Sequence, residues 1–85
     1  MKTLIAKYEQ MMKACGKDLK VILAEKISSP FAEEQHLLLS ETDKEWIIHP
    51  AILLKNGQVS TGNGTYLFKN SCSHHELKRI FDGRK

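Results

Sequence analysis

The residues best suited to chemistry in this 85-residue chain stand close together near its C-terminus, at Cys72, His74 and His75. A thiolate and two imidazoles are good zinc ligands, but a zinc site needs about four ligands at characteristic spacings, usually in two pairs. The remaining cysteine and histidines are remote in the sequence and unpaired: Cys15, His36 and His49. We therefore expect no metal site, and the sequence identifies no cofactor.

The same cluster could instead hold a thiol nucleophile. Such a nucleophile needs an oriented base, and the base needs a third group that holds it in place. No third group can be identified here, and a contact between Cys72 and Leu77 would bury the thiol as a small apolar group. Three nearby glycines, in the 57–64 segment, lack the lysine and the following helix of a phosphate-binding loop. We therefore expect no catalytic residue and no enzyme activity.

The positive charge of the chain is concentrated at the same end. The net charge is +3, and residues 69–85 carry five basic residues against two acidic ones, which equals that excess. Such an end can attract phosphate groups or an acidic partner, although basic residues near a helix C-terminus also favour the helix dipole. The candidate nucleic-acid contacts are the five basic side chains of this segment: Lys69, Lys78, Arg79, Arg84 and Lys85.

An amphipathic helix is predicted near the N-terminus. Apolar residues recur from Leu4 to Cys15 with the spacing of one helix face, and charged residues fall opposite them. Thr3 is the predicted cap of this helix, and Gly16 is the predicted left-handed stop. Cys15 lies at the end of the apolar stripe, so we expect it to be shielded from solvent.

A second helix is predicted at the C-terminus, and its start is well specified. Ser73 is the predicted cap, and Glu76 stands three residues later, as in a capping box. Cys72 and Leu77 are placed to form the hydrophobic staple around that cap. Gly83 is the predicted stop.

Extended segments and polar breaks alternate between the two helices. Residues 19–27 fit either a helix or a short buried strand, because periodicity does not separate the two in a short apolar run; we choose a strand. Pro30 and the residues after it suggest at most a turn or two of helix. Residues 36–40 and 45–49 are predicted strands, joined by a polar turn at 41–44.

The second half of the predicted sheet depends on turn residues. Asn56-Gly57 is a strong hairpin signal, because both central positions of a type I′ turn require positive φ. A two-residue loop there would place Leu54 opposite Val59. The glycines of residues 62–64 are expected to reverse the chain again, so that residues 65–69 form the third strand of a meander.

These elements predict an α+β fold, in which an N-terminal amphipathic helix and a C-terminal capped helix pack on a small, mostly antiparallel β-meander. With 41% hydrophobic and 27% charged residues, residues 1–85 are expected to form one domain with a modest core. The predicted core comprises apolar residues from both helices and the strands: Leu4, Ile5, Tyr8, Met11, Met12, Val21, Leu23, Trp46, Ile48, Ile52, Leu54, Val59, Leu67, Leu77, Ile80 and Phe81.

The function predicted from these features is that of a small non-enzymatic regulatory or binding module. Its expected partner is another protein or a second copy of itself. Pro50 cannot donate a ladder hydrogen bond, so it predicts a sheet edge, a bulge or a strand start, and an open edge would invite strand addition. The alternative is nucleic-acid binding through the basic C-terminal segment.

The cysteine count and the hydropathy pattern bear on the cellular location. Two cysteines are too few for the disulfide framework of a small secreted domain, so we expect reduced thiols. No apolar stretch reaches the length of about 18 residues that a bilayer span needs, and the N-terminus lacks the pattern of a signal peptide. We therefore expect a cytoplasmic protein without a membrane partner.

Overall fold

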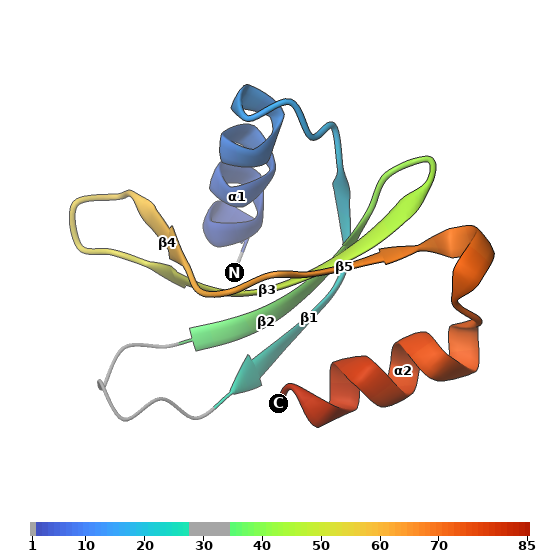
Figure 1. Cartoon of the computed structure of the whole chain (residues 1–85). Coiled ribbons are helices and arrows are strands. Elements are labelled where there is room, and N and C mark those ends of the chain that lie inside the picture. Colours follow the sequence, from blue (N-terminus) through green and yellow to red (C-terminus); the bar gives the residue numbers. More distant parts are fainter. Residues whose placement is uncertain (1, 28–34) are drawn as a thin grey trace.

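The computed structural model describes residues 2–27 and 35–85, which form two helices and five strands (Figure 1). The elements in chain order are α1 (Lys2–Ala14), β1 (Lys20–Ile27), β2 (Gln35–Glu41), β3 (Glu45–Leu53), β4 (Val59–Thr61), β5 (Thr65–Phe68), the short 3-10 turn η1 (Lys69–Ser71) and α2 (His74–Gly83). The strand predicted in residues 19–27 is confirmed as β1. The helical turn predicted after Pro30 lies outside the described residues.

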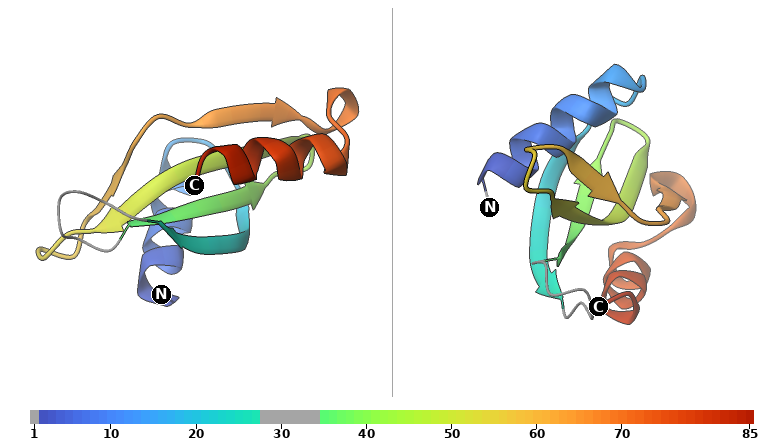
Figure 2. Two further views of the ribbon diagram at one scale, coloured as in Figure 1. Left: turned by 90° about the horizontal axis from the view of Figure 1, so that it is seen from below. Right: turned by 90° about the vertical axis from the view of Figure 1, so that its left-hand side faces the viewer.

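All strands belong to one antiparallel sheet between the two helices. β1 pairs with β2, β2 pairs with β3, and both β4 and β5 pair with the opposite side of β3. α1 covers one face of the sheet and α2 covers the other (Figures 1 and 2). The predicted α+β fold is therefore confirmed, with one helix on each face.

The helices cover two separate apolar cores. The core under α1 is formed by Leu4, Tyr8, Met12, Leu19, Leu38, Ile47 and Ala51. The core under α2 is formed by Leu37, Leu39, Trp46, Ile48, Leu77 and Phe81. Each helix is thus stabilised mainly by burying its apolar stripe, which matters because isolated helices of this length are marginal in water.

β2 is buried on both faces because a helix covers each of them. Leu38 faces α1, whereas Leu37 and Leu39 face α2, and all three are nearly inaccessible to solvent. A strand with one wet face would alternate apolar and polar residues. The run of three leucines therefore indicates that both faces of β2 are covered. The predicted core did not include these leucines.

Seven residues of the predicted core are confirmed as buried, eight are only partly buried, and one is exposed. The confirmed buried residues are Leu4, Tyr8, Met12, Trp46, Ile48, Leu77 and Phe81. Leu23 was expected in the core, but 41% of it is exposed. It lies on β1, which pairs only with β2 among the described strands. No described strand therefore covers the other side of Leu23.

The end of α1 is a complete glycine cap. Gly16 has φ +89°, its N–H donates to the Lys13 carbonyl, and the Lys17 N–H donates to the Met12 carbonyl. This pair of bonds satisfies carbonyls that the helix leaves open. The stop at Gly16 is confirmed. The predicted Thr3 cap is wrong, since the helix already includes Lys2, and Cys15 is exposed rather than shielded.

The start of α2 is confirmed, and its end is not. The Ser73 hydroxyl accepts a hydrogen bond of 3.2 Å from the Glu76 N–H, as an N-cap should. The Glu76 carboxylate forms an ion pair with Arg79. Gly83 was expected to stop the helix in the left-handed conformation, but it is the last helical residue, and positive φ among the described glycines occurs at Gly16 and Gly57.

β4 and β5 are two halves of one interrupted strand, which corrects the predicted reversal at residues 62–64. Both halves run antiparallel to β3: Ala51 pairs with Thr61, and Ile48 pairs with Thr65. Two residues of β3 therefore face three residues of the crossing segment, which is a bulge and not a turn. The Pro50 carbonyl accepts from the Gly62 N–H, so the missing donor of Pro50 faces this bulge.

Pro50 consequently lies in an interior strand opposite a bulge, so the bulge predicted for it as one alternative is confirmed and the sheet edge is not. Its partner on the other side is Leu37 of β2. Glycine is required at two positions of the bulge, because side chains of β3 approach its backbone closely there. A Cβ on Gly64 would lie 2.3 Å from His49 Nε2, and a Cβ on Gly62 would lie 2.8 Å from Pro50 Cγ.

The β3–β4 hairpin forms at Asn56-Gly57 with a different register from the predicted one. Leu53 pairs with Val59, and the Leu54 N–H donates to the Gln58 carbonyl. The loop therefore has three residues, and Gly57 takes the left-handed position with φ +86°. The prediction of a two-residue type I′ loop is wrong by one residue.

Two glycine substitutions are expected to have opposite effects on the stability of the protein. Gly64→Ala should destabilise the protein by about 1–3 kcal/mol, because its methyl group must displace the buried His49 ring. Gly83→Ala has open space around it and lies in a helix, so it should be neutral or stabilising by up to about 1 kcal/mol. Chemical denaturation measures both, and equal effects would contradict the close approach at Gly64.

Candidate functional site

The five basic residues proposed to contact nucleic acid are all engaged within the chain. Four of them form ion pairs: Lys69 with Glu41, Lys78 with Asp82, Arg79 with Glu76, and Lys85 with both Glu25 and Asp82. Arg84 instead donates to the Thr65 hydroxyl and to the Asn63 carbonyl. The structure therefore does not gather these cations into one unpaired patch.

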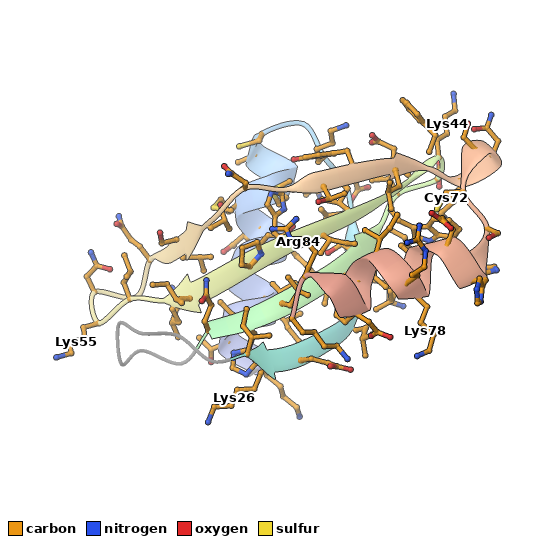
Figure 3. All side chains as sticks on the ribbon, turned by 60° about the horizontal axis from the view of Figure 1, so that its bottom comes forward. Lys26, Lys44, Lys55, Cys72, Lys78 and Arg84 are labelled. Atoms are coloured by element: carbon orange, nitrogen blue, oxygen red, sulfur yellow. The ribbon has the colours of Figure 1, made fainter. Side chains whose placement is uncertain are left out.

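The five cations also lie on different parts of the chain, with Lys69 in η1 and the others on α2 or directly after it. Lys78 extends into solvent from the outer side of α2, whereas Arg84 lies against the sheet (Figure 3). Lys69 is the first residue of η1, directly after β5, and its ammonium lies 5.9 Å from the centre of the Trp46 ring. A duplex backbone would have to compete with an acidic partner at four of the five positions.

The cysteine and histidine cluster is dispersed in the same way. Cys72 packs against the core under α2, and His74 lies beside Trp46 with 5.2 Å between the ring centres. Neither cysteine forms a disulfide bond. Within residues 2–27 and 35–85, no group of three or more histidine, cysteine, aspartate or glutamate side chains is placed to hold a metal ion.

A buried polar cluster lies under α1 and has the residue types of an acid–base site. The Tyr8 hydroxyl and His49 Nδ1 are 2.7 Å apart, and the Tyr66 ring meets the other side of the imidazole edge-on at 5.7 Å. Burial raises the pKa of Tyr8 to about 12. Burial, followed by the charge of Arg84, lowers the pKa of His49 below its usual 6.5.

Both members of this pair are therefore neutral at pH 7. A neutral imidazole with its proton on Nε2 accepts the Tyr8 hydroxyl proton in a hydrogen bond at Nδ1. The pair satisfies two polar groups that the core would otherwise leave unpaired. Its role is to hold α1 on the sheet, and the same ring forms the wall against which Gly64 packs.

Exposed large apolar side chains lie on two strands, with Tyr66 and Phe68 on β5 and Ile22 and Leu23 on the edge strand β1. Ile22 is 46% exposed and Leu23 is 41% exposed. β1 has eight residues and pairs only with β2 among the described strands, so its other side is an edge of the sheet, where the Val21 N–H donates to Glu9 Oε2. Sequence reasoning placed this segment correctly as a strand, but it assigned Leu23 to the core.

A groove runs beside this strand, between β1 and α2. Its volume is about 280 Å³. The floor is apolar, formed by Leu23, Leu39, Leu77 and Phe81, and the rim is formed by charged and polar residues of β1 and α2. A larger hollow of about 440 Å³ lies between α1 and the β3–β4 hairpin, but most of its lining is polar side chains and glycine, so it offers less apolar surface for binding.

Lys85 forms ion pairs with both sides of the β1–α2 groove. Lys85 Nζ lies 2.5 Å from Glu25 Oε2 on β1 and 3.0 Å from Asp82 Oδ1 on α2. The Glu25 and Asp82 carboxylates raise the pKa of Lys85, and Lys85 and Lys78 lower the pKa of Asp82. These contacts bridge the end of α2 and the edge strand across the groove.

Comparison of the chain with protein-family models, curated proteins and solved structures gave no match. In the part of the chain that the structure describes, neither helix is long and apolar enough to cross a membrane.

The buried His49 predicts acid sensitivity. Its pKa is lower in the folded state than in the unfolded chain, so the unfolded state takes up the proton first as pH falls. Stability should be complete above about pH 7 and should decline as pH drops below about 6.5.

Denaturation of the wild type and of two variants between about pH 5 and 7 tests this assignment. His49→Gln should lower stability but flatten its dependence on pH. His75→Gln, at an exposed position of α2, should leave that dependence unchanged. Identical pH profiles for all three proteins would show that His49 is not the group responsible.

Proposed function

We propose that this protein is a non-enzymatic binding module that captures another polypeptide by strand addition along β1. The observation that carries the proposal is the exposure of Ile22 and Leu23 on an eight-residue edge strand. Backbone groups of such an edge supply affinity, and neighbouring pockets select side chains. The groove between β1 and α2 provides a pocket of this kind, with Leu23 on its floor.

The arrangement of charges favours a polypeptide over a nucleic acid as the partner. Nucleic-acid affinity depends on cations that are available to neutralise phosphates, and four of the five predicted cations already have carboxylate partners. The groove also carries acidic residues, Glu25 and Asp82, at its rim. Because Lys78 and Lys85 pair with these carboxylates, the rim offers phosphate groups no excess of positive charge, whereas a peptide with apolar side chains would meet a matching floor.

The cellular setting that fits this proposal is the cytoplasm. Cys15 and Cys72 are both unpaired, and Cys15 is exposed. An exposed thiol is compatible with a reducing compartment, where it does not cross-link to other chains. We propose that the module works there by binding alone, as a regulator of its partner.

Two lysine substitutions at sheet edges test the proposed surface. Leu23→Lys should abolish capture of partner proteins, because it places a charge over the apolar floor. Phe68→Lys is the matched control, because Phe68 is 64% exposed and lies on β5, at the opposite edge of the sheet from β1. Both variants should remain folded, since each replaces a side chain that is already substantially exposed.

The readout is affinity capture from native extract with and without nuclease, followed by direct binding measurements with the captured protein. A partner retained by Phe68→Lys and lost by Leu23→Lys supports the proposal. Equal retention by both variants would contradict it. If capture disappears with nuclease and with Arg79→Ala plus Arg84→Ala, the nucleic-acid alternative is correct instead.

A further inference from the structure

We propose that the polypeptide that β1 binds is a second copy of this chain, in an antiparallel β1–β1 pair that places Lys20 opposite Glu25 of the other copy. This inference rests on the proposed binding edge. The two copies would be related by a two-fold axis perpendicular to the sheet, so the same surface is used twice. The two sheets would then join into one continuous sheet across the interface.

The bulge in β1 determines which residues of the two copies can lie opposite one another. Lys20 pairs with Glu41 and Glu25 pairs with Leu37, and the register shifts between Val21 and Leu23. Because positions 41 and 37 are four apart on β2, they lie on the same face of the sheet. Lys20 and Glu25 therefore share that face although they are five residues apart, which a strand without a bulge would not allow.

The two-fold axis preserves faces, so residues placed directly opposite each other must lie on the same face. With the axis between Ile22 and Leu23, the register meets this condition on both sides of the bulge. Val21 meets Ala24 of the other copy, and both pair with β2 residues, Ser40 and Leu38, that lie two apart on the face toward α1. The exposed Ile22 and Leu23 meet at the centre, where apolar surface is removed from water.

Charge complementarity distinguishes this register from a neighbouring one. The pair Lys20–Glu25 occurs twice across the axis, once on each side of the apolar centre. An axis at Glu25 would instead place two carboxylates opposite each other, and like charges in that position are unfavourable. Glu25 already holds Lys85 through one carboxylate oxygen, and the other oxygen can accept a bond from Lys20 of the second copy.

One contact limits the strength of this dimer. The Val21 N–H already donates to Glu9 Oε2 of α1 at 2.9 Å, so this amide is not open to a second strand. The ladder must form through the remaining outward groups. We therefore expect an equilibrium between monomer and dimer that depends on concentration, rather than a permanent dimer.

A charge exchange tests the register. Sedimentation equilibrium over micromolar to millimolar concentrations should show dimerisation of the wild type. Lys20→Glu and Glu25→Lys should each raise the dimer dissociation constant about tenfold, because each places like charges opposite one another at two symmetric sites. The double variant carrying both changes should recover affinity, since it restores both pairs with reversed sign.

Lys55→Glu is the matched control, because it makes the same charge change at the tip of the β3–β4 hairpin, far from β1 (Figure 3). It should dimerise as the wild type does. Circular dichroism establishes that each variant is folded. Recovery in the double variant separates the intermolecular pair from the Glu25–Lys85 pair within one chain, because Lys20→Glu cannot restore the latter.

Three results would overturn the inference: a wild type that stays monomeric at millimolar concentration, single charge variants that dimerise as the wild type does, or a double variant no tighter than the weaker single one. The first result leaves the proposed binding edge intact if Leu23→Lys still loses a captured partner that Phe68→Lys retains. Failure of the binding edge itself is thus distinguishable from failure of the self-pairing.

Discussion

The structure depends on one constraint, which is that the central strands β2 and β3 carry apolar side chains on both faces. A strand pair of this kind is stable only when both faces are covered. The helices at the two ends of the chain meet that need, α1 on one face and α2 on the other. Both helices are thereby committed to the core, and the surfaces left for binding are the sheet edges and the groove beside β1.

The two edges of the sheet differ in their exposed backbone. The edge beyond β3 is broken by the bulge at residues 62–64, where the chain packs tightly on His49 and Pro50. Each of its strand segments is short, with three residues in β4 and four in β5. Short and bulged edges resist strand addition. β1 also contains an irregularity, between Val21 and Leu23, but it is the longer edge, with eight residues.

Local patterns predicted much of this fold. The helical stripes, the Ser73 cap and the Gly16 stop follow from nearest-neighbour chemistry and are confirmed. Some failed predictions are local, namely the Thr3 cap, the Gly83 stop and the register of the Asn56-Gly57 hairpin. Others concern contacts between distant segments. Residues 62–64 looked like a turn because glycine serves both turns and close approaches, and only the packing against His49 separates the two. Leu23 looked like a core residue because the sequence does not reveal which strand lies at the edge.

The central claim is that β1 is the edge of the sheet that binds another polypeptide. The most direct test is to measure amide hydrogen exchange in dilute and in concentrated solutions of the protein. Exchange reports the opening of individual backbone hydrogen bonds. The amides of β2 and β3 should be the slowest at both concentrations, and protection within residues 20–27 should increase in the concentrated sample, while residues 65–68 stay unchanged. Increased protection in β5 with none in β1 would contradict the account.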